Sequence, residues 1–150
     1  MIKRVAYDLH GTIDIKPTIY KTFFKNSRRQ GNEIYIISGP PTEQVIKELQ
    51  DIDFIKGRDY DKAIGVVTYL LENGHIPTKI DHNGNYWFEE KAWWASKAQI
   101  CTDYKISGLI DNEEQYAADF RFTKAYFYLI RSLPNDRIVL FKLLQTLNNR

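Results

Sequence analysis

Three polar side chains that could act as nucleophile, metal ligand or anion-binding group each follow a short apolar run. Asp8 follows Val-Ala-Tyr, Ser38 follows Ile-Tyr-Ile-Ile, and Asp111 follows Gly-Leu-Ile. If these runs are parallel strands of one sheet, their carboxyl ends meet at the edge where open α/β sheets bind ligands. A single aspartate after a strand is more often a turn or cap residue. Three such residues at one edge instead predict a functional site.

These residue types suit chemistry on a phosphate. Attack by the Asp8 carboxylate on a phosphomonoester brings like charges together, so cations must neutralise the phosphoryl oxygens. Lys97 could supply one positive charge, because the helix expected over residues 89–104 places it on the flank of a buried face formed by Trp94, Ala98 and Cys101. A lone lysine is usually a solvated surface residue. Its position one helix before Asp111 favours a role in the site.

The elements that would position these residues follow the alternation of a doubly wound α/β domain. Predicted strands cover residues 2–8, 33–37, 52–55, 107–110 and 125–130. The first predicted helix begins at Pro17 and stops at Gly31, and further helices are predicted over 41–50, 60–73, 89–104 and 136–148. Residues 75–88 carry Pro and Gly-Asn turn signals and are expected to form a long connection with a short hairpin or an extended piece. The predicted fold is a three-layer α/β/α sandwich around a five-stranded, mainly parallel sheet.

Size and composition indicate a single globular domain. The chain has 150 residues, 43% of them hydrophobic, and a net charge of +2, so we interpret residues 1–150 as one domain with a buried core. The charge does not by itself indicate a nucleic-acid partner, although Lys25, Arg28 and Arg29 form a basic cluster. No apolar run approaches the about 20 residues of a membrane span, so we expect a cytoplasmic protein without a membrane partner.

The motifs and their order resemble those of the haloacid-dehalogenase-like phosphatases. DLHGTI at residues 8–13 resembles the family signature D-x-D-G-T-L/V, and ISG at 37–39 is similar to the second motif. Lys97 falls where the third-motif lysine is expected, and LIDN at 109–112 is similar to the acidic fourth motif. The resemblance covers about residues 2–130. It is closest to short phage and bacterial members of the family.

This resemblance implies a Rossmann-like core without a large cap domain and a magnesium-dependent phosphomonoester hydrolase. In that family the phosphoryl group passes to the first-motif aspartate, here Asp8. The implied metal ligands are the Asp8 carboxylate, the backbone carbonyl of His10 and the Asp111 carboxylate, with Asn112 next to them. The implied phosphate-binding residues are Thr12, Ser38, Gly39 and Lys97.

The sequence departs from the family pattern at two positions. His10 replaces the second aspartate of the first motif, which is the general acid and base in the family, but a histidine can exchange a proton near neutral pH. Asn112 stands where an acidic residue often follows Asp111. Two alternatives therefore stay open. One is a phosphate-binding pseudoenzyme, and the other is a phosphoacceptor receiver, which the first-strand ending DLHGT disfavours.

The segments that could hold a substrate-selecting cap are short or already used by core elements. Pro17 begins a helix soon after Asp8, and two helices and a strand occupy most of the chain from Ser38 to Lys97. An open site suits a phosphate on a large substrate, such as a nucleic-acid end or a phosphoprotein, or closure by a partner subunit in a homo-oligomer. The aromatic residues Trp87, Trp93 and Trp94 could stack on a ring, but we interpret them as core.

Overall fold

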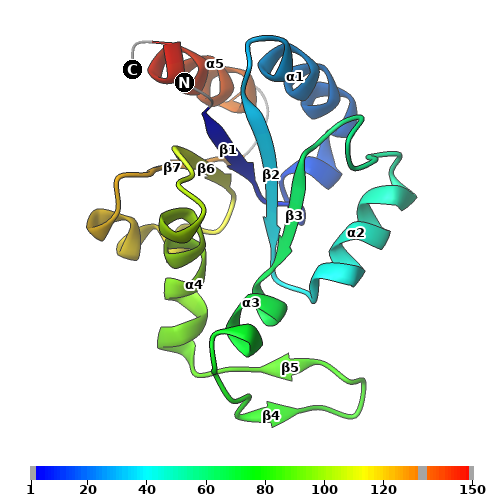
Figure 1. Cartoon of the computed structure of the whole chain (residues 1–150), viewed down its shortest axis with the longest axis vertical. Coiled ribbons are helices and arrows are strands. Elements are labelled where there is room, and N and C mark those ends of the chain that lie inside the picture. Colours follow the sequence, from blue (N-terminus) through cyan, green and yellow to red (C-terminus); the bar gives the residue numbers. More distant parts are fainter. Residues whose placement is uncertain (1–2, 132–134, 149–150) are drawn as a thin grey trace.

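Five parallel strands form the central sheet of the computed structural model, which describes residues 3–131 and 135–148 (Figure 1). The strand order is β3-β2-β1-β6-β7, so β1 lies in the centre of the sheet. All four pairings are parallel, which confirms the predicted class of sheet. The strands are β1 (Arg4–Tyr7), β2 (Glu33–Ser38), β3 (Lys62–Gly65), β6 (Gly108–Asp111) and β7 (Tyr126–Leu129).

Helices cover both faces of the sheet and produce the predicted Rossmann-like three-layer sandwich. One face packs against α1 (Pro17–Arg29), α2 (Thr42–Asp51) and α5 (Asn135–Asn148). The other face packs against α3 (Val66–Glu72), α4 (Glu90–Asp103) and the 3₁₀ helix η2 (Glu114–Phe122). A short 3₁₀ helix, η1 (Ile13–Ile15), connects β1 to α1. Among the helices of the described segments, none has both the length and the apolar composition of a membrane span.

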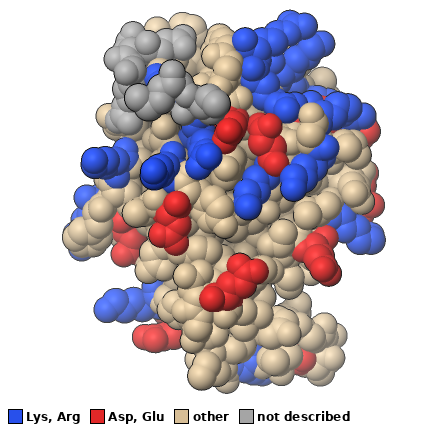
Figure 2. All heavy atoms as spheres, in the orientation of Figure 1, with Lys and Arg blue, Asp and Glu red and all other residues tan. Residues whose placement is uncertain are grey.

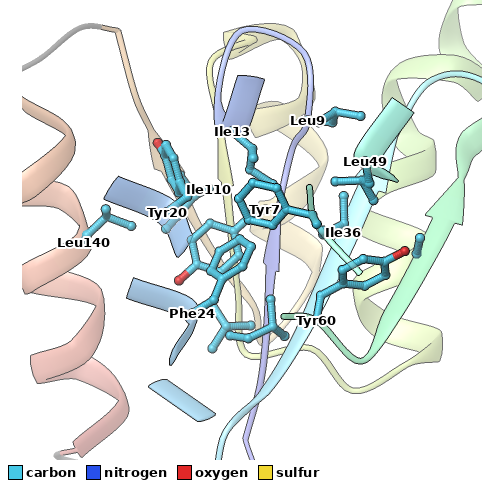
Figure 3. Close-up of a cluster of buried hydrophobic side chains, with 14 of the residues drawn as sticks. Tyr7, Leu9, Ile13, Tyr20, Phe24, Ile36, Leu49, Tyr60, Ile110 and Leu140 are labelled. Atoms are coloured by element: carbon cyan, nitrogen blue, oxygen red, sulfur yellow. The ribbon is translucent and has the colours of Figure 1, made fainter. Parts of the chain in front are cut away.

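An aromatic cluster fixes the central strand against α1. Tyr7 of β1 is buried, and its ring centroid lies 4.6 Å from that of Phe24, which in turn packs on Phe54 (Figure 3). Each fully buried side chain of this kind contributes about 1.5–3 kcal/mol. Because side chains alternate along a strand, Asp8 follows Tyr7 onto the opposite face. The packing of Tyr7 therefore fixes the direction of the Asp8 carboxylate.

The third predicted strand was wrong. Residues 52–55 form a turn after α2, in which Asp53 has a φ of 62° and Phe54 enters the aromatic cluster. The strand is instead β3, within the range predicted as a helix from 60 to 73, and the helix begins only at Val66. A parallel strand buried on both faces has no alternating pattern, so periodicity cannot separate it from a following buried helix. The first residue of predicted strand 2–8 lies outside the described residues.

The predicted hairpin in the long connection is confirmed. Strands β4 (Lys79–Ile80) and β5 (Tyr86–Trp87) pair antiparallel and project from the end of the molecule that holds α3 (Figure 1). Within the described residues this hairpin and the 3₁₀ helices are the additions to the sandwich, so there is no large cap domain.

The interpretation of the tryptophans as core was wrong for Trp87, which is 56% exposed, because its strand pairs only with β4. Trp93 and Trp94 are half-buried.

The end of β3 approaches the loop that follows β2. A methyl group at Gly65 would clash with the carbonyl oxygen of Pro40 and the backbone nitrogen of Thr42. The Gly65 N–H donates to the hydroxyl of Thr42 at 2.9 Å, which fixes the start of α2 against the sheet. Absence of a side chain at Gly65 is therefore needed to hold the loop after Ser38 in place.

We expect Gly65→Ala to lower the free energy of unfolding by about 3 kcal/mol, because backbone rather than flexible side chains must move. Gly57→Ala is the matched control, since its surroundings are open but its φ is 86°; we expect a loss of about 1 kcal/mol there. Urea denaturation of both variants measures the difference. Equal losses would show that the approach at Gly65 is not a constraint.

Candidate functional site

The carboxyl ends of the strands bring the sequence-predicted residues to one edge of the sheet. Tyr7 is in register with Ile36 of β2 and with Ile110 of β6. The Asp8 N–H donates to the carbonyl of Ile110 at 2.8 Å, so Asp8 and Asp111 extend from neighbouring strands. From β1 the chain adds β2 and β3 on one side of the sheet and β6 and β7 on the other. Ligands bind at such a switch point in folds of this class. The predicted convergence at this edge is confirmed.

Lys97 joins the two aspartates. Its ammonium donates to Asp8 Oδ1 at 2.9 Å and to Asp111 Oδ2 at 2.6 Å, and only 2% of the residue is exposed. The same nitrogen lies 4.3 Å from the centre of the buried Tyr116 ring, which adds a cation–π contact. A solvated surface lysine, the alternative weighed from sequence, does not describe this residue. Asp8, Lys97 and Asp111 form one buried ionic cluster.

Small residues on α4 allow the lysine to enter the sheet edge. Ala98 and Cys101 pack into the core cluster beneath the sheet, and Ser96 is also buried. The predicted burial of Ala98 and Cys101 is confirmed, but Trp94 is only half-buried, and its ring packs edge-on against Tyr116 at 4.9 Å. Burial raises the pKa of the Cys101 thiol to about 12, so the thiol is protonated and unreactive at neutral pH.

The cluster carries an excess of negative charge. Two carboxylates face one ammonium, and the three side chains are almost fully removed from water. Burial raises the pKa of the Asp8 carboxyl to about 6, an effect that Lys97 opposes and Asp111 reinforces. Burial alone would lower the pKa of Lys97, but the two carboxylates outweigh it and raise that pKa. The lysine is therefore charged, and the cluster favours a further cation or a proton on Asp8.

Asn112 lies beside the free oxygen of Asp8. With its amide nitrogen turned inward, Asn112 donates to Asp8 Oδ2 and to the carbonyl oxygen of His10, each at 3.0 Å. With the amide oxygen turned inward, three oxygen atoms would converge, and oxygen ligands of these kinds suit Mg²⁺. A side chain at Gly11 would clash with this amide, so the glycine lets the loop approach it. In this second orientation the oxygen donors at this point would fit a small hard cation.

The position of Asp111 as a metal ligand stays a prediction. Asp111 Oδ2 accepts from Lys97, and Oδ1 accepts from the N–H of Glu113 at 2.8 Å. Each oxygen retains a second lone pair. Within residues 3–131 and 135–148, no three His, Cys, Asp or Glu side chains are grouped as a metal site. The fit to magnesium therefore depends on oxygens from Asp8, the His10 backbone and Asn112 together with Asp111.

Two hydroxyls predicted to bind phosphate are buried without a hydrogen-bond partner. These are Ser38 Oγ, which is fully buried at the end of β2, and Thr12 Oγ1 in the loop after β1. An unpaired buried hydroxyl costs about 1–3 kcal/mol, so each such group needs an explanation, and a ligand is one of them. Gly39 follows Ser38, and a Cβ at this position would lie 3.2 Å from the Trp93 ring. The hydroxyls are available as donors to an oxyanion.

His10 reaches the site by its backbone, while its ring turns toward α2. Its Nε2 lies 2.7 Å from Oε2 of Glu48, and 49% of the imidazole is exposed. An open hollow of about 340 Å³ adjoins Gly11 and Asn112 on the surface beside the loop. Sequence reasoning missed Glu48 and Tyr116, because nothing in the local sequence relates either residue to His10 or Lys97.

The basic cluster predicted from sequence lies away from this edge. Lys and Arg side chains gather over α1, whose last turn precedes the start of β2 (Figure 2). Arg28 is already engaged by Asp61 at 3.1 Å and by backbone carbonyls. Asp8 follows the opposite end of β1, so the cluster does not contribute to the ionic site.

Comparison with known proteins supports the fold. The chain matches no family model and no curated protein. It is similar in structure to an uncharacterized protein from Corynebacterium glutamicum, known from a crystal structure. The TM-score is 0.59, the sequences are 12% identical, and the match covers 95% of each chain. At that identity the likeness shows the three-layer fold alone.

We expect Lys97→Met to destabilise the fold by about 3–5 kcal/mol at neutral pH, because it leaves two buried carboxylates without their cation. In the variant, burial of the Asp8 carboxyl without Lys97 should keep its pKa above the unfolded value of about 4, so stability falls as pH rises from that value through the folded-state pKa. The loss should therefore be smaller at about pH 5 than at about pH 8. Urea denaturation measures it, with Lys91→Met on the same helix as control. A loss independent of pH would contradict the electrostatic account.

Proposed function

We propose that this chain is a magnesium-dependent phosphomonoesterase of the haloacid-dehalogenase-like superfamily, with Asp8 as nucleophile. The observation that carries the proposal is the buried cluster in which Lys97 bridges Asp8 and Asp111. A structural ion pair does not need two carboxylates per ammonium, and this excess of negative charge suits a site that binds a cation with its substrate. The unpaired hydroxyls of Thr12 and Ser38 supply further donors to the phosphate.

The reaction takes place in two steps on the Asp8 carboxylate. A carboxylate oxygen forms a bond to phosphorus, the bond from phosphorus to the ester oxygen breaks, and the leaving oxygen takes a proton from His10. Water then attacks the aspartyl-phosphate, gives a proton back to His10, and releases phosphate from Asp8. Lys97 holds Asp8 in place through both steps. Magnesium bound to the oxygens of Asp8, the His10 backbone and Asp111 would neutralise the phosphoryl charge.

A second candidate is a phosphate-binding domain that does not hydrolyse its ligand. One observation favours it: the Asn112 amide contacts the free oxygen of Asp8. In this case the hydroxyls of Thr12 and Ser38 would still bind a phosphate. Turnover and its dependence on His10 separate the two candidates.

An aryl phosphate assay with magnesium tests the nucleophile. We expect Asp8→Asn to lower kcat by at least about 10⁴-fold, because an amide is a far poorer nucleophile and a weaker metal ligand. Asp51→Asn makes the same chemical change at an exposed side chain of α2 and should retain wild-type turnover. Turnover by Asp8→Asn equal to that of the wild type would remove Asp8 as nucleophile.

Variants at His10 test the acid and base. His10→Ala should lower kcat by about 10²- to 10⁴-fold while magnesium affinity changes little, because the ligand is a backbone oxygen. His10→Asp should retain turnover, with its pH profile moved to lower pH, because a carboxyl is more acidic than an imidazolium. If the chain is instead a pseudoenzyme, the wild type should show negligible turnover, and only His10→Asp should be active. Side-by-side kinetics with isothermal titration of magnesium give the answer.

A further inference from the structure

A hydrogen-bonded chain links α2 to the loop that follows β1. Nε2 of His10 lies 2.7 Å from Oε2 of Glu48, and Nε2 of Gln44 donates to Oε1 of Glu48 at 3.0 Å. An ionised carboxylate can only accept, so the hydrogen of the first contact belongs to the imidazole Nε2. Both oxygens of Glu48 are therefore engaged, and its carboxylate is held on two sides.

The sequence places these groups together through helix geometry. Gln44 and Glu48 are four residues apart on α2, so they lie on the same side of the helix. The start of α2 is fixed by Thr42, whose N–H donates to the hydroxyl of Thr68 at 2.9 Å. The glutamate therefore reaches the loop from an anchored helix.

Energetics indicate that this contact is not chiefly a source of stability. The side chains of His10 and Glu48 are 49% and 32% exposed, and ion pairs at such exposure contribute little to folding. Its larger effect is on the ring itself. A half-exposed imidazole otherwise rotates and exchanges its proton between two nitrogens, whereas a fixed partner selects one orientation and one tautomer.

We propose that Glu48 is the positioning residue of His10, and that it holds Nε2 as a donor so that Nδ1 exchanges the catalytic proton. The inference rests on the proposed function, because it assigns a partner to the acid and base of that reaction. Nδ1 gives its proton to the leaving oxygen and regains one from the attacking water. Glu48 touches neither substrate nor metal and acts only through the ring. The arrangement corresponds to a histidine oriented by a carboxylate on its other nitrogen.

Kinetics of double variants test whether Glu48 acts through His10. We expect Glu48→Ala to lower kcat by about 10- to 150-fold with little change in KM, the range for loss of a hydrogen bond to a charged group. Glu48→Gln keeps an acceptor and should recover part of the loss. Glu43→Ala, on the same helix, is the matched control. In a His10→Ala background, Glu48→Ala should cause no further loss, and an equal loss in both backgrounds would overturn the proposal.

Nitrogen NMR of the imidazole tests the same inference without any turnover. At a pH where the ring is neutral, the wild type should show the proton of His10 on Nε2, and Glu48→Ala should show both tautomers. Two tautomers in the wild type would overturn the positioning role even if the enzyme is active. A single Nε2–H tautomer in an inactive protein would support the role of Glu48 and count against the phosphatase proposal alone.

Discussion

Burial of the Lys97 ammonium between two carboxylates is the constraint on which the structure depends. An ammonium removed from water costs several kcal/mol unless charged partners replace the lost hydration. Asp8 and Asp111 are such partners only because β1 and β6 are neighbours in the sheet. The strand order, the small residues of α4 and the Tyr116 ring all serve this contact. A different order of strands would leave the lysine unpaired.

The surrounding loops complete the site in a different way. Around the ionic cluster, the loop after β1 brings a backbone carbonyl, a hydroxyl and an imidazole, each directed to a different neighbour. Asn112 faces the carbonyl of His10, and Glu48 accepts a hydrogen bond from the His10 imidazole. The Thr12 hydroxyl is buried without a hydrogen-bond partner. The rigid part of the site thus lies on strands and α4, while His10, the residue for which we propose proton transfer, lies on a partly exposed loop.

The sequence predicts the sheet edge well because strand ends are local signals. Asp8, Ser38 and Asp111 each terminate an apolar run, and parallel topology then places them together. It fails at β3, where Ala63 to Val67 is apolar through both the strand and the helix that follows. Gly65 lies at that junction, but a glycine within an apolar run can equally be a residue inside a helix. Contacts such as that of Glu48 depend on how α2 packs, which no local pattern contains.

The separation of the ionic partners in the chain has a consequence for folding. Lys97 and Asp8 are 89 residues apart in sequence, and Asp111 lies a further 14 residues beyond Lys97. During synthesis β1 can pair with β2 early, but its other edge stays open until β6 emerges. Until then the Asp8 carboxylate remains hydrated and β1 offers an unpaired edge to other chains. Completion of the site and protection from aggregation therefore happen in the same late event, when the middle of the sheet closes.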